Sequence, residues 1–539
     1  MSDDIFKQFK EHSVAEFFKK NRQMLGFSGK VRSLTVIVHE FVTNSLDACE
    51  EAGILPELYV QVEELSRDNE HYRLTVKDNG PGIPKTHIGK ALGQMLAGTK
   101  FHRYLQQRGQ QGIGAAACTM FSYLTTGQPT KAISCYKGKK LTSNISIDFK
   151  ANKPEVEVLE ELDALPGESG LTVVSEFKDV RYERSNYGVH EYLRRTALAN
   201  PHCTITLVEP NNERAVFPRS IPENPSRPFE IKPHPLGVGT HDILEFARHN
   251  QESRRLSSFL QETFSRVSAG KVDELKAVLP EMDFNKAPQD LAWEEAEALV
   301  KAFAKVKWIS PATDSLVPIG RGQVETSFRN IFNPEVLVVT ERSPKVYRGG
   351  IPFMVEVGIA YGGGVAAAGK RGEVMRFANR VPLLFDSGGC AITETIKTMD
   401  WKRYDIKAFE EEPVAVLVNL VSVHVPYTSA GKQAISPEED VMDEIKFALM
   451  EASRGVQKYL SGKRRAHEIA TKKKVVSRYI QQLSGDLATL SGAKRADVEK
   501  ELTRIIEEKY AQDETEVEET AESEPETGNG KPEEGGEEE

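Results

Sequence analysis

Apolar and polar residues recur along the first part of the chain in patterns that predict a mixed helix-and-strand domain. Residues 33–52 ("SLTVIVHEFVTNSLDACEEA") place apolar side chains three and four positions apart, which indicates a helix with one buried face. Segments such as "ELYVQVEEL" and "YRLTVKD" alternate with a period of two, as half-buried strands do. Mostly antiparallel strands with helices on one face predict an α/β two-layer sandwich over residues 1–210.

The pattern changes several times after residue 210. Residues 211–239 are rich in proline and predict an extended linker. Residues 240–307 are almost purely helical in pattern, which predicts a small domain of short helices. Strands return in residues 308–470, which predicts a second α/β unit that ends in a long helix. The fold class is therefore α+β, with several domains.

The C-terminal part is charged and helical in pattern. We expect helix from Pro437 to Tyr510, with breaks near Gly462 and Gly485, so that residues 471–511 form separate C-terminal helices. Residues 512–539 are almost entirely polar and acidic, so they cannot bury a core and are predicted to be disordered.

Charge and composition indicate a reducing compartment and permit contact with nucleic acid. The residues from Asp513 onward carry thirteen acids and one lysine, a net −12 against −10 for the whole chain, so the preceding residues carry +2. The five cysteines lie far apart, without a C-x-x-C pair, which favours a reducing cytoplasm over a disulfide framework or a zinc site. No apolar run is long enough to span a bilayer, and the charged N-terminal segment does not resemble a signal peptide.

The helix over residues 33–52 carries an unusual polar face. Glu40, Asn44 and Asp47 are spaced i, i+4 and i+7, so they lie in one line beside the buried stripe. Taken alone, this face is more often a solvated surface than a functional one.

Two glycine-rich segments follow that helix. "VKDNGPGIP" places Asp78 at the end of a strand, ahead of Gly82, and "RGQQGIGAAACTMF" places glycines at the start of a helix. Glycines at a helix N-terminus let backbone N–H groups approach phosphate oxygens. In this order and spacing, E-x-x-x-N, D-x-G-x-G and G-x-x-G-x-G resemble the GHKL ATPases, which have the Bergerat α/β sandwich.

That resemblance implies a role for each of the matching residues. Glu40 resembles the general base for the water that attacks the γ-phosphate of ATP. Asn44 resembles the ligand that offers an oxygen to Mg²⁺. Asp78 resembles the carboxylate that accepts a hydrogen bond from the adenine amine, and Gly82 leaves room for the ring.

The resemblance also implies a lid that wraps the phosphates. Its expected members are Thr99 and Lys100 of "AGTKFHR" and the run Gly109, Gln110, Gln111, Gly112, Ile113, Gly114, Ala115 and Ala116.

Longer segments are similar to one family in particular. "SVAEFFKKNRQMLGF", "YLRRTALANPHCTITLVEP", "RFANRVPLLFDSGGCAITETI" and "PYTSAGKQAI" resemble the topoisomerase VI B subunits, the ATPase subunits of the type IIB DNA topoisomerases. The resemblance implies an N-terminal dimerisation strap, a helix–two-turn–helix domain at 240–307 and a transducer at 308–470. It also implies C-terminal helices that dock the topoisomerase VI A subunit. Lys432 resembles the lysine that reaches from the transducer to the γ-phosphate, and would be a second catalytic group.

This resemblance implies ATP and Mg²⁺ as cofactors, and a function in DNA topology. ATP would close two copies around double-stranded DNA, and an A₂B₂ heterotetramer would pass that duplex through a break made by the A subunit. The setting would be an archaeal-type cytoplasm at the nucleoid, with no membrane. None of the tyrosines lies in a recognisable DNA-cleaving context, so cleavage is expected from the partner.

Two alternative functions share parts of this pattern. A GHKL chaperone or mismatch-repair-type ATP clamp shares the ATPase, but those proteins join the ATPase domain to the transducer without a helical insert. A binding module that does not hydrolyse ATP is disfavoured by Glu40 and Lys432.

The chain also departs from the family pattern, with His39 and Thr43 beside the motif residues. Leu171 separates Gly170 from Thr172, which puts a nucleotide contact by Thr172 in doubt. The basic segment "SGKRRAHEIATKKKVVSRY" predicts contact with DNA or a solvated charged helix about equally.

Overall fold

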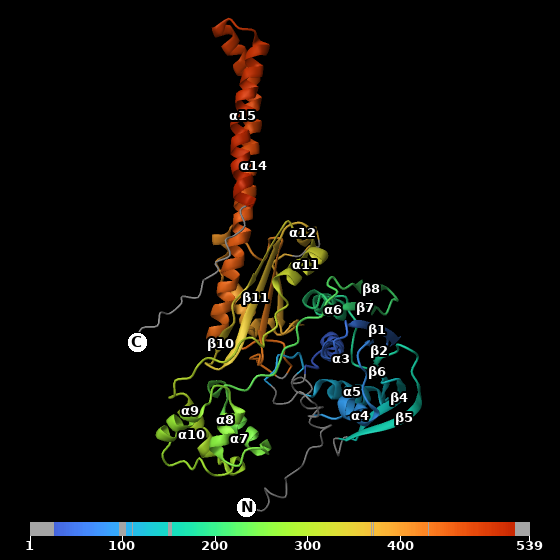
Figure 1. Cartoon of the computed structure of the whole chain (residues 1–539). Coiled ribbons are helices and arrows are strands. Elements are labelled where there is room, and N and C mark those ends of the chain that lie inside the picture. Colours follow the sequence, from blue (N-terminus) through green and yellow to red (C-terminus); the bar gives the residue numbers. More distant parts are fainter. Residues whose placement is uncertain are drawn as a thin grey trace, which may run out of the picture.

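The computed structural model describes residues 26–95, 104–109, 112–148, 153–367, 369, 371–429 and 431–522, with the backbone alone for residues 511–522 (Figure 1). The N-terminal dimerisation strap that the resemblance implies falls on residues 1–25, outside the described part.

The N-terminal domain is built on an eight-stranded sheet in the order β5-β4-β3-β6-β2-β1-β7-β8. All neighbouring strands pair antiparallel except β1 and β7, which are parallel. Its strands are β1 (Glu57–Ser66), β2 (His71–Lys77), β3 (Thr130–Tyr136), β4 (Lys139–Asp148), β5 (Lys153–Asp163), β6 (Gly170–Phe177), β7 (Thr204–Val208) and β8 (Arg214–Phe217).

Helices cover one face of this sheet and share its core (Figure 1). Alternate residues of β1 (Leu58, Val60 and Val62) are buried, as the period-two pattern predicts. The helices are α3 (Lys30–Ala52), α4 (Lys85–Gly93), α5 (Gly114–Thr126) and α6 (Val189–Ala199). The predicted two-layer α/β sandwich is thus confirmed.

The domain extends further than predicted. Residues 211–239 were expected to form only a linker, but β8 lies within them and pairs with β7. The short strand "RAVF" is hard to recognise in the sequence because prolines follow it at once. The extended linker therefore begins after Phe217.

The linker leads to a helical domain with a core of its own, set apart from the sheet domain (Figure 1). Aromatic residues dominate that core, and Phe259, Phe264 and Phe303 are fully buried. Its helices are the short 3₁₀ helix η1 (Pro235–Gly237), α7 (Thr240–His249), α8 (Leu256–Thr263), α9 (Ala269–Val278), the 3₁₀ helix η2 (Pro288–Asp290) and α10 (Trp293–Phe303).

The second α/β unit is built on a six-stranded sheet in the order β10-β11-β14-β12-β13, with β9 paired to β11. β14 is buried along its whole length and β11 along nearly all of its length, which explains their continuous apolar runs. The strands are β9 (Val336–Glu341), β10 (Lys345–Tyr347), β11 (Ile351–Tyr361), β12 (Glu373–Ala378), β13 (Val381–Pro382) and β14 (Val414–Ser422). The helices around this sheet are α11 (Arg321–Phe332), α12 (Gly364–Ala367), η3 (Ser387–Gly389), α13 (Ala391–Thr398) and η4 (Trp401–Tyr404).

The C-terminal region is a long helical hairpin that projects away from both sheets (Figure 1). The first helix, α14 (Glu439–Ser491), packs on the second sheet through its N-terminal third, and α15 (Arg495–Glu522) returns along it.

The expected breaks at Gly462 and Gly485 are wrong, since α14 runs through both residues. A glycine costs only about 1 kcal/mol within a helix, and the good helix formers around it outweigh that cost. The helix ends instead at Gly492, which adopts the left-handed conformation (φ 68°) of a C-terminal cap. α15 also continues beyond residue 512, into the segment predicted to be disordered.

Candidate active site

Asp78 lies directly after β2 and is held by three donors. Its carboxylate accepts hydrogen bonds from the Ser45 hydroxyl (2.8 Å) and from the backbone N–H groups of Gly80 (3.0 Å) and Leu171 (3.0 Å). The side chain is buried, and burial raises the pKa of Asp78, against the effect of these hydrogen bonds. A carboxylate has about four acceptor positions, so Asp78 retains capacity for one further donor, such as the amine of adenine.

The backbone around Asp78 requires glycine at two places. Gly82 has a φ of 73°, and a Cβ atom there would lie 2.3 Å from the carbonyl oxygen of Cys135 in β3. Gly170 has a φ of 112°, and its Cβ atom would lie 2.1 Å from the carbonyl oxygen of Asp78. Gly82 was expected to leave room for the adenine ring. In the structure, a side chain at this position would first collide with the backbone of β3, which crosses the turn. Leu171, and not Thr172, is the neighbour of Gly170 that contacts Asp78.

Glu40 lies where the glycine-rich segment enters α5. Its side chain is 31% exposed, and a Cβ atom on Gly114 would lie 1.7 Å from its carboxylate oxygen Oε2. The N-terminal end of a helix favours a negative charge, and its first N–H groups have no partners within the helix. Glu40 and a phosphate can therefore share this end of α5, and Gly114 leaves the space for the carboxylate.

Asn44 lies one turn after Glu40 on α3, with its side chain exposed. Its amide oxygen is the kind of hard ligand that Mg²⁺ accepts, together with water and phosphate oxygens. The described residues contain no cluster of three His, Cys, Asp or Glu side chains that could hold a metal by themselves. The exposed Asn44 amide therefore offers one oxygen ligand that fits a magnesium ion.

Lys432, a residue of the second α/β unit, lies near His39 of α3. It adopts a positive φ of 50° and is half-buried. His39 is buried, and burial lowers its pKa, while the charge of Glu40 raises it and the charge of Lys432 lowers it again. Lys432 thus lies within electrostatic range of His39, the residue before Glu40, although about 390 residues separate them in the sequence. His39 also packs edge-on against Tyr192, as a core residue does.

Only some of the remaining members of the predicted lid belong to the described part of the chain. Thr99, Lys100, Gln110 and Gln111 lie outside the described residues. Ala115 and Ala116 are buried, so only their backbone N–H groups could meet a phosphate. Gly112 has a φ of 58°, which agrees with a tight approach to the helix.

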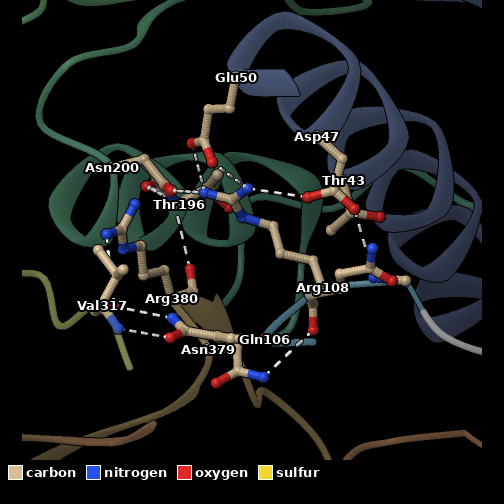
Figure 2. A network of polar contacts seen from close by, with 12 residues as sticks. Thr43, Asp47, Glu50, Gln106, Arg108, Thr196, Asn200, Val317, Asn379 and Arg380 are labelled. Carbon is tan, nitrogen blue, oxygen red and sulfur yellow. Dashed lines mark hydrogen bonds and ion pairs between the residues drawn. The ribbon is translucent and has the colours of Figure 1, made fainter. Parts of the chain in front are cut away.

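One group of site residues was missed by sequence analysis. Asp47, the third member of the polar face, is buried, and its Oδ1 atom accepts a hydrogen bond from Arg108 at 2.9 Å. Arg108 also donates to both carboxylate oxygens of Glu50 (2.9 and 2.7 Å) and to Asn200 at the end of α6 (Figure 2). Burial by itself would lower the pKa of Arg108, and the charges of Glu50 and Asp47 outweigh it and raise that pKa. The sequence signal was an arginine placed directly before the first glycine of the loop.

The basic segment on α14 has acidic partners in the second α/β unit. Lys463 forms an ion pair with Glu335 (2.6 Å), and Arg464 forms one with Asp405 (2.9 Å). A DNA phosphate would have to compete with these carboxylates for both side chains.

Comparisons with known proteins cover nearly the whole chain. A family profile described as "Histidine kinase-, DNA gyrase B-, and HSP90-like ATPase" matches residues 29–151, and one described as "Topoisomerase VI B subunit, transducer" matches residues 311–473. The chain is 42% identical to the B subunit of type 2 DNA topoisomerase 6 from Pyrococcus horikoshii, over 97% of this chain and 99% of that one. It is 43% identical to the corresponding protein of Thermococcus onnurineus, over 97% and 99%. Identity to the Methanothermobacter thermautotrophicus protein is 44%, over 93% of this chain and 96% of that one.

In the described part of the chain, no helix has the length and apolar character needed to cross a bilayer.

Proposed function

The chain belongs to the family of topoisomerase VI B subunits, the ATPase subunits of type IIB DNA topoisomerases, and we propose that ATP binding drives two copies to close around a DNA duplex. Hydrolysis then reopens the clamp after the duplex has passed through a break made by the A subunit. The products are relaxed supercoils and separated DNA rings. The assembly is an A₂B₂ heterotetramer at the nucleoid of the cytoplasm.

The observation that carries this proposal is the approach of the second α/β unit to the part of α3 that holds Glu40. Glu40 lies against the start of α5, where a phosphate is also favoured, and Lys432 of the second α/β unit lies within electrostatic range of its neighbour His39. Glu40 acts as the general base that accepts a proton from the attacking water. When bound, Mg²⁺ compensates charge on the phosphates, and Asn44 is its ligand.

In this scheme, Lys432 couples ATP hydrolysis to the opening and closing of the clamp. Its ammonium group compensates negative charge on the γ-phosphate, in bound ATP and in the transition state. ADP offers no γ-phosphate, so the contact reports which nucleotide is bound. Asp78 takes no part in the reaction and binds the adenine in both states.

The helical hairpin offers a surface for a second protein. Val475, Tyr479, Leu483, Leu487 and Leu490 recur at spacings of four and three residues along α14, and their exposure ranges from 37% to 84%. An exposed apolar stripe of this length on a charged helix is typical of a docking surface. We assign it to the A subunit.

Two substitutions test the ATPase. Glu40→Ala should retain ATP binding and lose hydrolysis by ~10²–10⁴-fold, since it removes only the base. Asp78→Asn is the matched control, because it removes a ground-state contact and should weaken ATP binding first. Isothermal titration with a non-hydrolysable ATP analogue and steady-state hydrolysis separate the two effects. Equal losses of affinity and rate in Glu40→Ala would show that Glu40 serves the structure of the pocket instead.

Reconstitution with the A subunit tests the wider proposal. The pair should relax supercoiled DNA with ATP, and neither protein should do so without the other. A chain that hydrolyses ATP but never supports strand passage with its partner would overturn the topoisomerase assignment.

A further inference from the structure

A two-residue turn of the second α/β unit is buried against the N-terminal domain, the domain of the eight-stranded sheet, which we call the nucleotide domain. Asn379 and Arg380 connect β12 to β13, with positive φ angles of 47° and 67°. Two consecutive residues of this conformation form the tight hairpin turn that glycine usually occupies. Both side chains are nevertheless buried, at 3% and 5% exposure. An arginine that is held in a left-handed conformation and buried points to a specific role.

The turn contacts residues 106–108, which lead into the glycine-rich loop that begins at Gly109. The Asn379 amide donates a hydrogen bond to the carbonyl oxygen of Gln107 at 3.2 Å. The Arg380 carbonyl accepts one from Asn200 at 3.2 Å, and Asn200 in turn accepts one from Arg108 (Figure 2). The turn therefore reaches Gln107 directly and Arg108 through one intermediate.

The segment itself is fixed on its other sides. Gln106 makes two hydrogen bonds with Val317, one to its carbonyl oxygen (2.7 Å) and one from its N–H (2.6 Å). The Arg380 guanidinium donates to the carbonyl of Pro318, the next residue, at 2.8 Å. Gly109, the first glycine of the loop, donates its N–H to Asp47 at 3.4 Å. Each residue from 106 to 109 is thus anchored immediately before the loop begins.

The packing beside this segment leaves room for a second arrangement. A cavity of about 300 Å³ is lined by residues 105–108, by the linker around Arg227 and by the Asn379–Arg380 turn. Both polar atoms of the Gln107 side chain are buried there without a hydrogen-bond partner. An unsatisfied buried amide is costly, so the segment gains from any shift that gives this side chain a partner.

We propose that the Asn379–Arg380 turn is a positioning element for the glycine-rich loop, and a second connection between the two domains besides Lys432. Docking of the turn fixes Gln107 and Arg108, and these residues set the position of Gly109 and the loop behind it. The inference rests on the proposed nucleotide site, and it assigns control of nucleotide affinity to the turn.

The two connections differ in the nucleotides that they sense. Lys432 meets the γ-phosphate, so its loss affects ATP and leaves ADP binding as it was. The N-terminal end of α5, which follows the loop, favours phosphates that ADP also carries, so loosening this anchor weakens ATP and ADP alike. A measurement of ADP affinity therefore separates the turn from the lysine.

The test uses the full chain and two independent variants. Gln106→Met keeps the side-chain length and removes both hydrogen bonds to Val317. Asn379→Ala removes the bond to Gln107 together with the two hydrogen bonds between this side chain and the Ser422 backbone that hold the turn on β14. Each should raise the Kd for ADP and for a non-hydrolysable ATP analogue by at least about fivefold, the change that a single lost hydrogen bond corresponds to. The KM for ATP should rise equally, with kcat at saturating ATP within about twofold of wild type. Gln106→Glu, which keeps an acceptor for the Val317 N–H, should recover part of the loss.

Two control variants exclude a general loosening of the structure. Gln457→Ala removes a comparable side-chain-to-backbone hydrogen bond, to Arg403, far from the loop. Arg32→Ala breaks another contact between the same two domains, to Asp386. Neither should change ADP affinity, and thermal unfolding verifies that all variants are folded.

Two outcomes overturn the inference. One is an unchanged Kd for ADP in both test variants while wild type binds and hydrolyses ATP, which leaves the proposed function standing. The other is an equal rise in the Kd for ADP in Arg32→Ala, which would reduce the effect to weakened domain docking. A wild-type chain that binds no ATP would instead refute the proposed function itself.

Discussion

Two arginine ion-pair sites of opposite character lie where the second α/β unit meets the N-terminal nucleotide domain. Beside the Lys432 loop, Arg32 forms a two-pronged ion pair with Asp386, with both bonds at 2.8 Å and with the side chains 20% and 43% exposed. At the other site, beside the Asn379–Arg380 turn, Arg108 lies 5% exposed between Asp47 and Glu50, and these three residues all belong to the N-terminal domain. The ion-pair distances at the two sites are similar, and the sites differ in how far their side chains are exposed to solvent.

Exposure to solvent determines how much each ion pair contributes to the free energy of unfolding. An exposed ion pair is screened and contributes little, whereas breaking a buried one leaves an uncompensated charge in a poorly solvated place. The Arg32 guanidinium also lies 4.7 Å from the ring of Phe385, whose N–H donates to Gln433 next to Lys432. We therefore expect the Arg32 contact to be easily opened and the Arg108 network to persist.

The largest effect on stability is expected at the buried network. Arg108→Ala leaves Asp47 and Glu50 without their cation and should lower the free energy of unfolding by about 3–5 kcal/mol. Urea unfolding of the full chain measures it. Combining Arg108→Met with Asp47→Asn and Glu50→Gln should recover part of the loss, because no charge is then left buried. A loss below about 1 kcal/mol in Arg108→Ala, as an exposed pair would give, would remove the distinction between the two contacts.

Lys432→Ala should separate activity from stability. The variant is expected to bind nucleotide and to lose ATP hydrolysis by ~10²–10³-fold, because a charge that stabilises the transition state is gone. Its free energy of unfolding should stay within about 0.5 kcal/mol of wild type, as expected for a half-buried surface residue. Small-angle scattering should show its ATP-analogue form resembling its ADP form. Normal hydrolysis and strand passage would show that the lysine has no such role.

Acid should weaken another contact between the two domains, at α6. On α6, burial raises the pKa of Glu191, and hydrogen bonds and charges from Arg194 and Arg195 outweigh burial and lower it to about 2. Both arginines also bind Glu373 on β12. Because the folded pKa lies below the unfolded value of about 4.3, the contribution is complete above that pH and is lost as pH falls towards 2.

Glu191→Gln tests this dependence. Wild type should lose up to about 3 kcal/mol of stability from this group between about pH 4.3 and 2, and the variant should show a flatter profile there. Urea unfolding at stepped pH measures the slope. Identical slopes in the two proteins would show that Glu191 keeps its proton affinity on folding.

The smallest effect is expected at the exposed contact. Arg32→Ala should cost about 0–1 kcal/mol at low salt, and the cost should vanish near ~1 M salt, where the screening length falls to ~3 Å. The charge-reversed pair Arg32→Asp with Asp386→Arg should restore wild-type stability. A salt-independent loss would instead assign the contact to packing of Arg32 on Phe385.

The candidate site was predictable where its parts are local. The helix with Glu40 and Asn44 follows from apolar periodicity, and Asp78 follows from a strand that ends in a glycine-rich turn. The continuous α14 was mispredicted because glycine is a weak helix breaker when its neighbours favour helix. β8 was missed because a strand as short as Arg214–Phe217 carries too little alternation to be recognised beside prolines.

The sequence by itself determined the order of the elements, the chemistry of the motif residues and the family, since each depends on residues close together along the chain. Only the tertiary structure decided which charges meet. Asp47 was one of three residues on a polar face, and its burial against Arg108 depends on how the segment before the loop packs on α3. The same holds for Asn379 and Lys432, whose partners lie hundreds of residues away and are brought near by the docking of two domains. Local periodicity carries no information about such docking, because side chains distant in sequence meet only through the packing of complete cores.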